Sequence, residues 1–261
     1  MLCRELARLM FSNDRAYIKL DMSEYMESHS VSRMIGAPPG YAGHEEGGRL
    51  TEAVRRQPYS VVVFDEIEKA HKDVFNILLQ ILDEGRLTDG CGAEVSFKNC
   101  IVVMTCNVGF ENIGREKECG FLSDKNGEID DDALDKKTGS ALKKLFTAEL
   151  LNRVDETVVF RFLTASDARE IAEKMLDDLK KRCADVGCFL QFSPDVSAYV
   201  ADIGCGREYG ARNLRRVIRK QIEDVISLEI LNGKIKNDSE ITVDVFNAGL
   251  VFRRNTKANF V

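Results

Sequence analysis

Two acidic residues at the end of an apolar run are the clearest candidates for chemistry in this sequence. Asp65 and Glu66 follow the stretch VVVF at 61–64, which is typical of a buried strand in a parallel sheet. In a Walker B element the first acid of such a pair helps to hold Mg²⁺ near nucleotide phosphates, and the second orients and polarises the attacking water. Many strands end in acids that only cap a loop, so the pair alone leaves both interpretations open.

A second apolar run, CIVVMTCN at 100–107, ends in the amide Asn107. Between the two runs, VFNILLQILDEG at 74–85 has helical periodicity and a glycine stop. The order strand, helix, strand predicts a parallel α/β sheet, in which ligands bind beyond the carboxyl ends of the strands. We therefore expect Asp65, Glu66 and Asn107 to gather at that edge, although an Asn that only caps the next segment is the alternative.

The remaining pattern predicts two domains, at 1–163 and 164–261. In the first we expect a helix at 2–11, a strand at 17–22, a helix at 140–154 and a strand at 157–163. The second, smaller and mainly helical, should contain a helix at 166–184, a strand near 188–192, a helix after Pro194, a basic helix from Glu208 to about Leu231 and a strand pair near 240–253. Two stretches read as loops, 36–48 because it is rich in Gly and Pro, and 110–138 because it is polar with little periodicity.

Composition excludes several classes of partner and site. The 261 residues carry a formal net charge of -6, with basic residues mixed among acidic ones, so we expect neither nucleic acid nor a membrane as a primary partner. No apolar run approaches the ~20 residues that cross a bilayer, and the opening stretch is unlike a signal peptide. The eight cysteines form no CxxC pair, which fits the cytoplasm and argues against a metal site built from cysteine.

Longer strings give a specific resemblance to a known family. DMSEYMESHSVSRMIGAPPGYAGHEEGGRLTEAVRRQPYSVVVFDEIEKAH and LLQILDEGRLTDG resemble the last ATPase module of the Clp unfoldases, the ClpA, ClpB and ClpC group of AAA+ proteins. The likeness runs from Met1 to about residue 253 and is greatest to the ClpC type. It implies an AAA+ domain around a five-stranded parallel sheet, here without its first strand and P-loop, followed by a small mainly helical α+β domain.

The resemblance also assigns a substrate loop. The family's GYVG loop lines a central pore, and its tyrosine grips the polypeptide that is being moved. GYAG places this loop on Gly40, Tyr41, Ala42 and Gly43. An aromatic ring on a loop flanked by glycines can press on any extended chain without reading its sequence. A turn whose tyrosine packs on its own domain is the alternative.

Three further residues match catalytic and nucleotide-binding positions of the family. Asn107 resembles sensor 1, which helps to position the water or the γ-phosphate. Arg153, in ELLNRVDE, matches the arginine finger that reaches the neighbouring subunit's site, and Arg212, in REYGARNLRRVI, resembles sensor 2, which contacts nucleotide in its own subunit. A finger that acts in trans implies a homo-oligomer, a hexameric ring in this family; otherwise Arg153 is a surface charge paired with Asp155 or Glu156.

The 110–138 loop contains a candidate docking tripeptide. In ClpA and ClpC a sequence such as IGF or LGF in this loop binds the ClpP peptidase, and Gly120 and Phe121 of CGFL match it. Cys119 departs from the usual large aliphatic residue and weakens the match. An exposed Phe in a polar loop would have a purpose in a partner's pocket. The alternative is a Phe that folds back on its own domain.

The helix LCRELARLMF resembles the one that directly follows the Walker A sequence GxxGxGKT, and the given chain starts at that point. The Walker A loop supplies the backbone N–H groups and the Lys that hold phosphates. On that basis we expect this polypeptide alone to be inactive, neither binding ATP tightly nor hydrolysing it. A fragment of a longer unfoldase, a naturally shortened ring subunit and a decayed remnant are the three explanations, and the intact motifs favour the first.

The function implied by the resemblance is that of a subunit or fragment of an ATP-dependent protein unfoldase. It would thread unfolded proteins through a hexameric pore for a ClpP-type peptidase, with ATP and Mg²⁺ as cofactors and Asp65 as an indirect Mg²⁺ ligand. The rival hypothesis is a ring or docking module without ATPase activity of its own.

Overall fold

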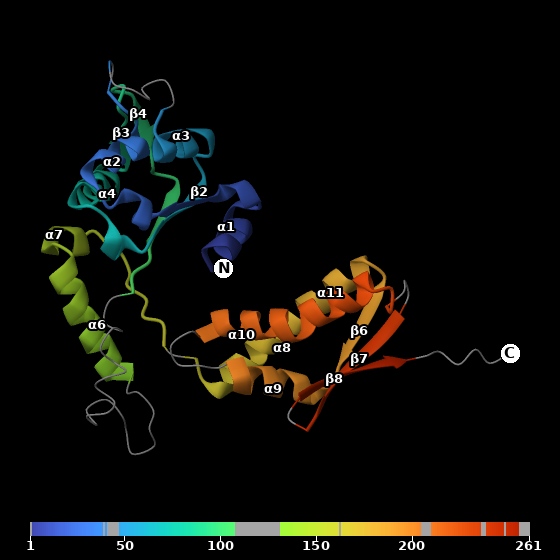
Figure 1. Ribbon diagram of the computed structural model, residues 1–261. Coiled ribbons are helices and arrows are strands. Elements are labelled where there is room, and N and C mark those ends of the chain that lie inside the picture. Colours follow the sequence, from blue (N-terminus) through green and yellow to red (C-terminus); the bar gives the residue numbers. More distant parts are fainter. Residues whose placement is uncertain are drawn as a thin grey trace. The chain divides into compact units, whose positions relative to one another are not determined.

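The computed structural model describes residues 2–38, 40, 47–107, 131–161, 163–204, 210–235, 239–247 and 249–255. These divide into two units, 1–159 and 160–261, which we describe one at a time (Figure 1). The unit boundary lies close to the expected domain boundary at 163/164, which stays a prediction.

Three parallel strands form the sheet of the first unit. Strand β1 (Tyr17–Asp21) pairs with β2 (Ser60–Asp65), and β2 pairs with β5 (Cys100–Met104) in the order β1-β2-β5. Asp21 lies opposite Asp65, and Phe64 lies opposite Met104. The strand β2 is central, so its β-branched residues are buried on both faces, as the apolar run predicts. The expected α/β fold is confirmed.

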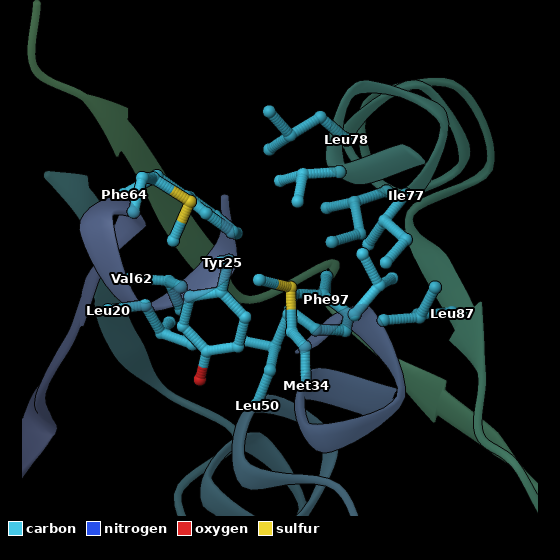
Figure 2. Packing of buried hydrophobic residues seen from close by; sticks show 14 of the residues in the cluster. Leu20, Tyr25, Met34, Leu50, Val62, Phe64, Ile77, Leu78, Leu87 and Phe97 are labelled. Carbon is cyan, nitrogen blue, oxygen red and sulfur yellow. The ribbon is translucent and has the colours of Figure 1, made fainter. Parts of the chain in front are cut away.

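Helices cover both faces of this sheet. On one face α1 (Leu2–Phe11) packs Ala7 against Val61 and Val63. On the other lie α2 (Ser28–Ile35), α3 (Arg49–Arg56) and α4 (Lys72–Glu84), whose apolar residues join Val62 and Phe64 in the main core. Because successive side chains of a strand point to opposite faces, β2 serves both layers. Figure 2 shows the ring of Tyr25 among the apolar side chains of the second layer.

Short elements connect these helices and strands. The 3-10 helices are η1 (Asp14–Ala16), η2 (Met22–Tyr25) and η4 (Ile67–Lys69). Helix α4 begins after His71, whose ring nitrogen accepts a hydrogen bond from the Asp73 amide, and ends at Gly85 with φ 65°. An antiparallel hairpin follows, β3 (Arg86–Thr88) and β4 (Glu94–Ser96), which the sequence analysis did not predict.

Residues 131–161 differ from three of our expectations. Helix α6 (Asp131–Leu145) occupies the end of the stretch that we expected to be a loop, 110–138, and the helix expected at 140–154 is split. Helix α6 ends before Thr147, whose hydroxyl caps the short helix α7 (Ala148–Leu151). The strand expected at 157–163 is wrong, because its described residues form neither helix nor strand. Val158 is 64% and Phe160 67% exposed, and among the described residues β5 has no second neighbouring strand to pair with.

The second unit is a small α+β fold, as expected. Helices α8 (Ala165–Asp185), α9 (Pro194–Gly204), α10 (Gly210–Ile218) and α11 (Asp224–Leu231) pack against the three-stranded sheet β6 (Cys188–Phe192), β7 (Ser239–Phe246) and β8 (Gly249–Asn255). Thr164 and Asp167 form a capping box at the start of α8. The continuous helix expected from 208 to 231 is interrupted by a π-helical turn, Arg219–Glu223, in which the Asp224 amide donates to the Arg219 carbonyl.

Candidate functional site

Three polar side chains stand in a row across the carboxyl edge of the first unit's sheet. Asp21 and Asp65 are the last residues of β1 and β2 and lie opposite each other. Thr105 directly follows Met104, the partner of Phe64, so it occupies the equivalent place after β5. Residues in register on parallel strands share a face, and the row therefore lies on the face covered by α1.

Asp65 is held from two sides. The Nζ of Lys19, on the neighbouring strand, lies 2.5 Å from Oδ2, and the Thr105 hydroxyl donates to Oδ1. The hydrogen bond to Asp65 raises the pKa of Lys19, so the lysine is a permanent cation at this edge. The carboxylate is 29% exposed. Asp65 is thus fixed in orientation while remaining open to solvent.

Glu66 is placed by a tight turn that is tied to β5. Its backbone is left-handed, with φ 57° and ψ 49°, which is rare for a residue with a side chain. The Glu66 amide donates to Thr105 Oγ1 at 3.1 Å, and the Ile67 amide donates to the Thr105 carbonyl at 3.0 Å. Its carboxylate pairs with Lys69 Nζ at 2.6 Å and is 28% exposed.

Asn107 lies beside the same turn. Its backbone amide donates to Glu68 Oε1 at 3.2 Å, and Asn107 is exposed. Glu68 belongs to η4, which follows directly after Glu66. The structure therefore brings Asp65, Glu66 and Asn107 to one edge of the sheet, as the strand pattern predicts.

The donor set at this edge fits a magnesium ion carried by phosphates. Mg²⁺ is usually bound by one or two carboxylates, and phosphate and water oxygens supply its other ligands. Asp65 and Glu66 offer such carboxylates, each more than a quarter exposed. Each carboxylate pairs with a lysine, Asp65 with Lys19 and Glu66 with Lys69.

The two arginines that we singled out belong to other elements of the chain. Arg153 follows α7 and forms an exposed ion pair with Asp83 near the end of α4. This partner differs from Asp155 and Glu156, the acids named in the surface-charge interpretation. Arg212 is exposed on α10 in the second unit. Their roles stay predictions.

Most of the substrate loop and the docking tripeptide lie outside the described residues. This holds for Tyr41, Ala42 and Gly43, and for Gly120 and Phe121. Gly40 is described and has φ 90°, a value that side chains disfavour.

Sequence reasoning missed three residues of the site, namely Lys19, Glu68 and Thr105. A signal for Lys19 was present, because it is the one basic residue in the strand YIKLD and stands two positions before its acidic end. Thr105 and Glu68 gave no comparable signal. Their contacts join segments that are about 40 residues apart.

Two kinds of feature are absent from the part of the chain that the structure describes. In that part, no three or more His, Cys, Asp or Glu residues are grouped so that they could hold a metal ion. No helix within the same ranges combines the length and the apolar character needed to cross a membrane.

Comparisons with known proteins agree on one family. Residues 1–157 match the family model of the AAA domain (Cdc48 subfamily), and residues 163–243 match that of the C-terminal, D2-small domain of ClpB protein. The chain is 47% identical over 248 residues to "Chaperone protein ClpB" of Oceanobacillus iheyensis, covering 95% of this chain and 30% of that protein. It is also 47% identical over 258 residues to "Negative regulator of genetic competence ClpC/MecB" of Bacillus subtilis, covering 99% and 32%.

A third relative is named for its activity. "ATP-dependent Clp protease ATP-binding subunit ClpC" of Staphylococcus aureus is 47% identical over 243 residues, which cover 93% of this chain and 30% of the relative. The chain thus spans about a third of the length of these relatives.

Proposed function

Because the chain belongs to the AAA domain family, in the group that includes the ClpB and ClpC proteins, we propose that it is one ATPase module of a protein unfoldase. The observation that carries this proposal is the joint placement of Asp65, Glu66 and Asn107 at the carboxyl edge of a parallel sheet. One relative is named a chaperone and another an ATP-binding subunit of a protease, which supports an activity on other proteins.

In this proposal each residue of the edge has one task. Asp65 helps to hold Mg²⁺, indirectly through water, and the ion neutralises charge on the phosphates. Glu66 orients and polarises the attacking water. Lys69 releases the Glu66 carboxylate when nucleotide arrives. Asn107 positions that water or the γ-phosphate, with its backbone fixed by Glu68. Arg212 binds nucleotide from the second domain.

We further propose a ring of identical subunits in which Arg153 acts on the neighbouring site. Fingers of this kind are worth roughly 10³ to 10⁵ in rate, or about 4–7 kcal/mol. Arg153 is exposed and its guanidinium pairs only with a surface carboxylate among the contacts described, which supports a residue that can exchange partners.

The remaining parts of the proposal concern substrates and partners. GYAG, at Gly40 to Gly43, contacts unfolded proteins through Tyr41, and the segment with Gly120 and Phe121 binds a ClpP-type peptidase. The ATPase domain spans 1–163 and the small domain 164–261. The free cysteines among the described residues fit the reducing cytoplasm as the place of action.

A hybrid protein tests the proposal. This chain replaces the segment that it matches in the Bacillus subtilis relative, and ATP hydrolysis and the unfolding of a fluorescent protein are measured. We expect Glu66→Gln to lower the hydrolysis due to this module by about 10² to 10⁴.

The matched control is Glu84→Gln, which also removes one carboxylate charge from a glutamate that is paired with a basic residue, Arg86. It should leave hydrolysis unchanged. A hybrid that unfolds the reporter equally well with and without Glu66→Gln would show that this module acts as a ring or docking part and not as an ATPase.

A further inference from the structure

Three glycines bring the two ends of the segment 37–47 against each other and against the β3–β4 hairpin. Gly36 ends α2, Gly48 precedes α3, and Gly90 lies in the turn between β3 and β4. We call this contact of Gly36, Gly48 and Gly90 the neck. The Gly90 amide donates to the Ile35 carbonyl at 2.9 Å, which ties the hairpin turn directly to the end of α2.

Space, rather than backbone conformation, requires glycine at two of the three positions. A Cβ on Gly48 would lie 2.2 Å from the carbonyl carbon of Ile35, and one on Gly90 would lie 2.3 Å from the carbonyl oxygen of Gly36. Neither residue has a positive φ. The atoms in the way belong to backbone, so no side-chain rotation can make room. Only Gly36, with φ 98°, is also favoured by its conformation.

The hairpin side of the neck is fixed by Asp89. Its Oδ1 accepts hydrogen bonds from the Cys91 amide at 2.9 Å and the Ala93 amide at 2.8 Å, which shape the turn. Its Oδ2 accepts from the guanidinium of Arg55 at 2.6 Å, and Arg55 belongs to α3. The Asp89 side chain is only 9% exposed. The turn is therefore tied to α2 by backbone and to α3 by an ion pair.

From these contacts we propose that Gly48, Gly90, Asp89 and Arg55 are positioning residues. They make the β3–β4 hairpin shift as one body with Gly36 and Gly48, the residues that flank the segment 37–47. The inference rests on the proposed function, in which that segment carries Tyr41. A displacement of α4, which packs on β3, would then move both ends of the substrate loop together. The neck is thus a mechanical link between the hairpin and the loop that contacts the unfolded chain.

Hydrogen exchange of the full chain, resolved to peptides, tests the link. Gly90→Ala must move the turn away from Gly36 by about 0.7 Å before the Cβ reaches an allowed distance of 3.0 Å. We expect the Gly90–Ile35 hydrogen bond to be lost and exchange to rise about five- to tenfold in both 34–38 and 86–97. The matched control is Gly92→Ala, in the same turn with φ 83° and open space around its Cβ. It strains the hairpin without touching the neck, so only 86–97 should respond.

If Gly90→Ala unfolds the whole unit, Arg55→Gln provides a second test of the link. It removes the ion pair with Asp89, and also the ion pair with Glu52 within α3, but it leaves the glycines of the neck in place. Exchange should again rise in both segments, with peptides from β2 unchanged. A rise confined to 86–97 in both Gly90→Ala and Arg55→Gln overturns the link.

A second readout separates the link from the proposed function. A photo-crosslinking amino acid at position 41 is exposed to unfolded casein. Crosslinking that weakens in Gly90→Ala but persists in Gly92→Ala supports the neck as a positioning device. If position 41 gives no crosslink while the exchange results are as expected, the neck stands and the substrate role of Tyr41 falls.

Discussion

Replacing the hydroxyl of Thr105 tests the construction of the site most directly. The hydroxyl donates to Asp65 and accepts from the Glu66 amide at 3.1 Å, so it joins both acids to β5. Thr105→Val keeps the shape and branching of the side chain and removes both hydrogen bonds. The Glu66 amide is then left without its acceptor, in a turn whose backbone is left-handed.

The expected cost is about 2 kcal/mol in the free energy of unfolding. A hydrogen bond to a charged group contributes roughly 1.5–3 kcal/mol, and an unsatisfied buried donor costs about 1–3 kcal/mol. The total lies slightly below the sum of the two lower limits, because Asp65 keeps Lys19 as a partner and water reaches its carboxylate. A loss of about 2 kcal/mol is roughly thirtyfold in the folding equilibrium. At a urea dependence of about 2 kcal/mol per M, the midpoint falls by about 1 M.

Urea titration with peptide-resolved hydrogen exchange measures this loss in the unit that contains β2. Thr105→Ser is the control, since it keeps the hydroxyl and removes one methyl group, and it should cost less than about 1 kcal/mol. If Thr105→Val and Thr105→Ser have the same midpoint, the hydroxyl does not support the site and our reasoning is wrong. The hybrid protein should also hydrolyse ATP more slowly with Val than with Ser.

Three other predictions follow from named contacts. Arg153→Ala should change the free energy of unfolding by less than about 1 kcal/mol, because the pair of Arg153 with Asp83 is exposed. The same substitution should lower ATP hydrolysis in the hybrid about 10³-fold or more. Small effects on both stability and hydrolysis would refute the role of Arg153 as an arginine finger. Burial acts to raise the pKa of Asp89, but hydrogen bonds from Arg55 and from the Ala93 and Cys91 amides outweigh it and hold that pKa below its usual range. The pKa of Asp89 is thus lower in the folded state than in the unfolded state. The stability that Asp89 contributes is therefore complete above about pH 4 and is lost as the pH falls through the folded pKa. Asp89→Asn should remove this part of the acid sensitivity, which is measured as the difference in unfolding free energy between pH 7 and pH 3. Leu78→Ala, at a fully buried position, should cost about 2–5 kcal/mol in urea titration, and a smaller loss would mean that the core closes over the cavity.

The sequence was sufficient for elements whose signal is local. The run VVVF followed by two acids predicted β2 and the position of Asp65 and Glu66, and the pattern of 74–85 predicted α4. The strand pattern also placed Asn107 at the same edge, because parallel strands end on one side of their sheet. The family resemblance, carried by contiguous strings, was confirmed by the comparisons.

Elements that depend on contacts with distant segments could not be predicted from the local pattern. TVVFRFL at 157–163 has the composition of a strand, but its described residues remain unpaired with any strand, so propensity alone did not make one. The β3–β4 hairpin was missed because each of its strands has only three residues, too few for a periodic signal. The basic helix after 208 contains a π-helical turn that no residue type announced.

The sequence by itself determined the strands and helices that have a periodic pattern and the motifs that are contiguous, since both are local properties of a chain. Only the tertiary structure decided which side chains meet. Lys19 neutralises Asp65, Thr105 joins both acids to β5, and Gly36, Gly48 and Gly90 close the neck, and each contact depends on segments that are distant in sequence. Register between strands and close approach of backbones arise from packing, and a local pattern carries no record of either.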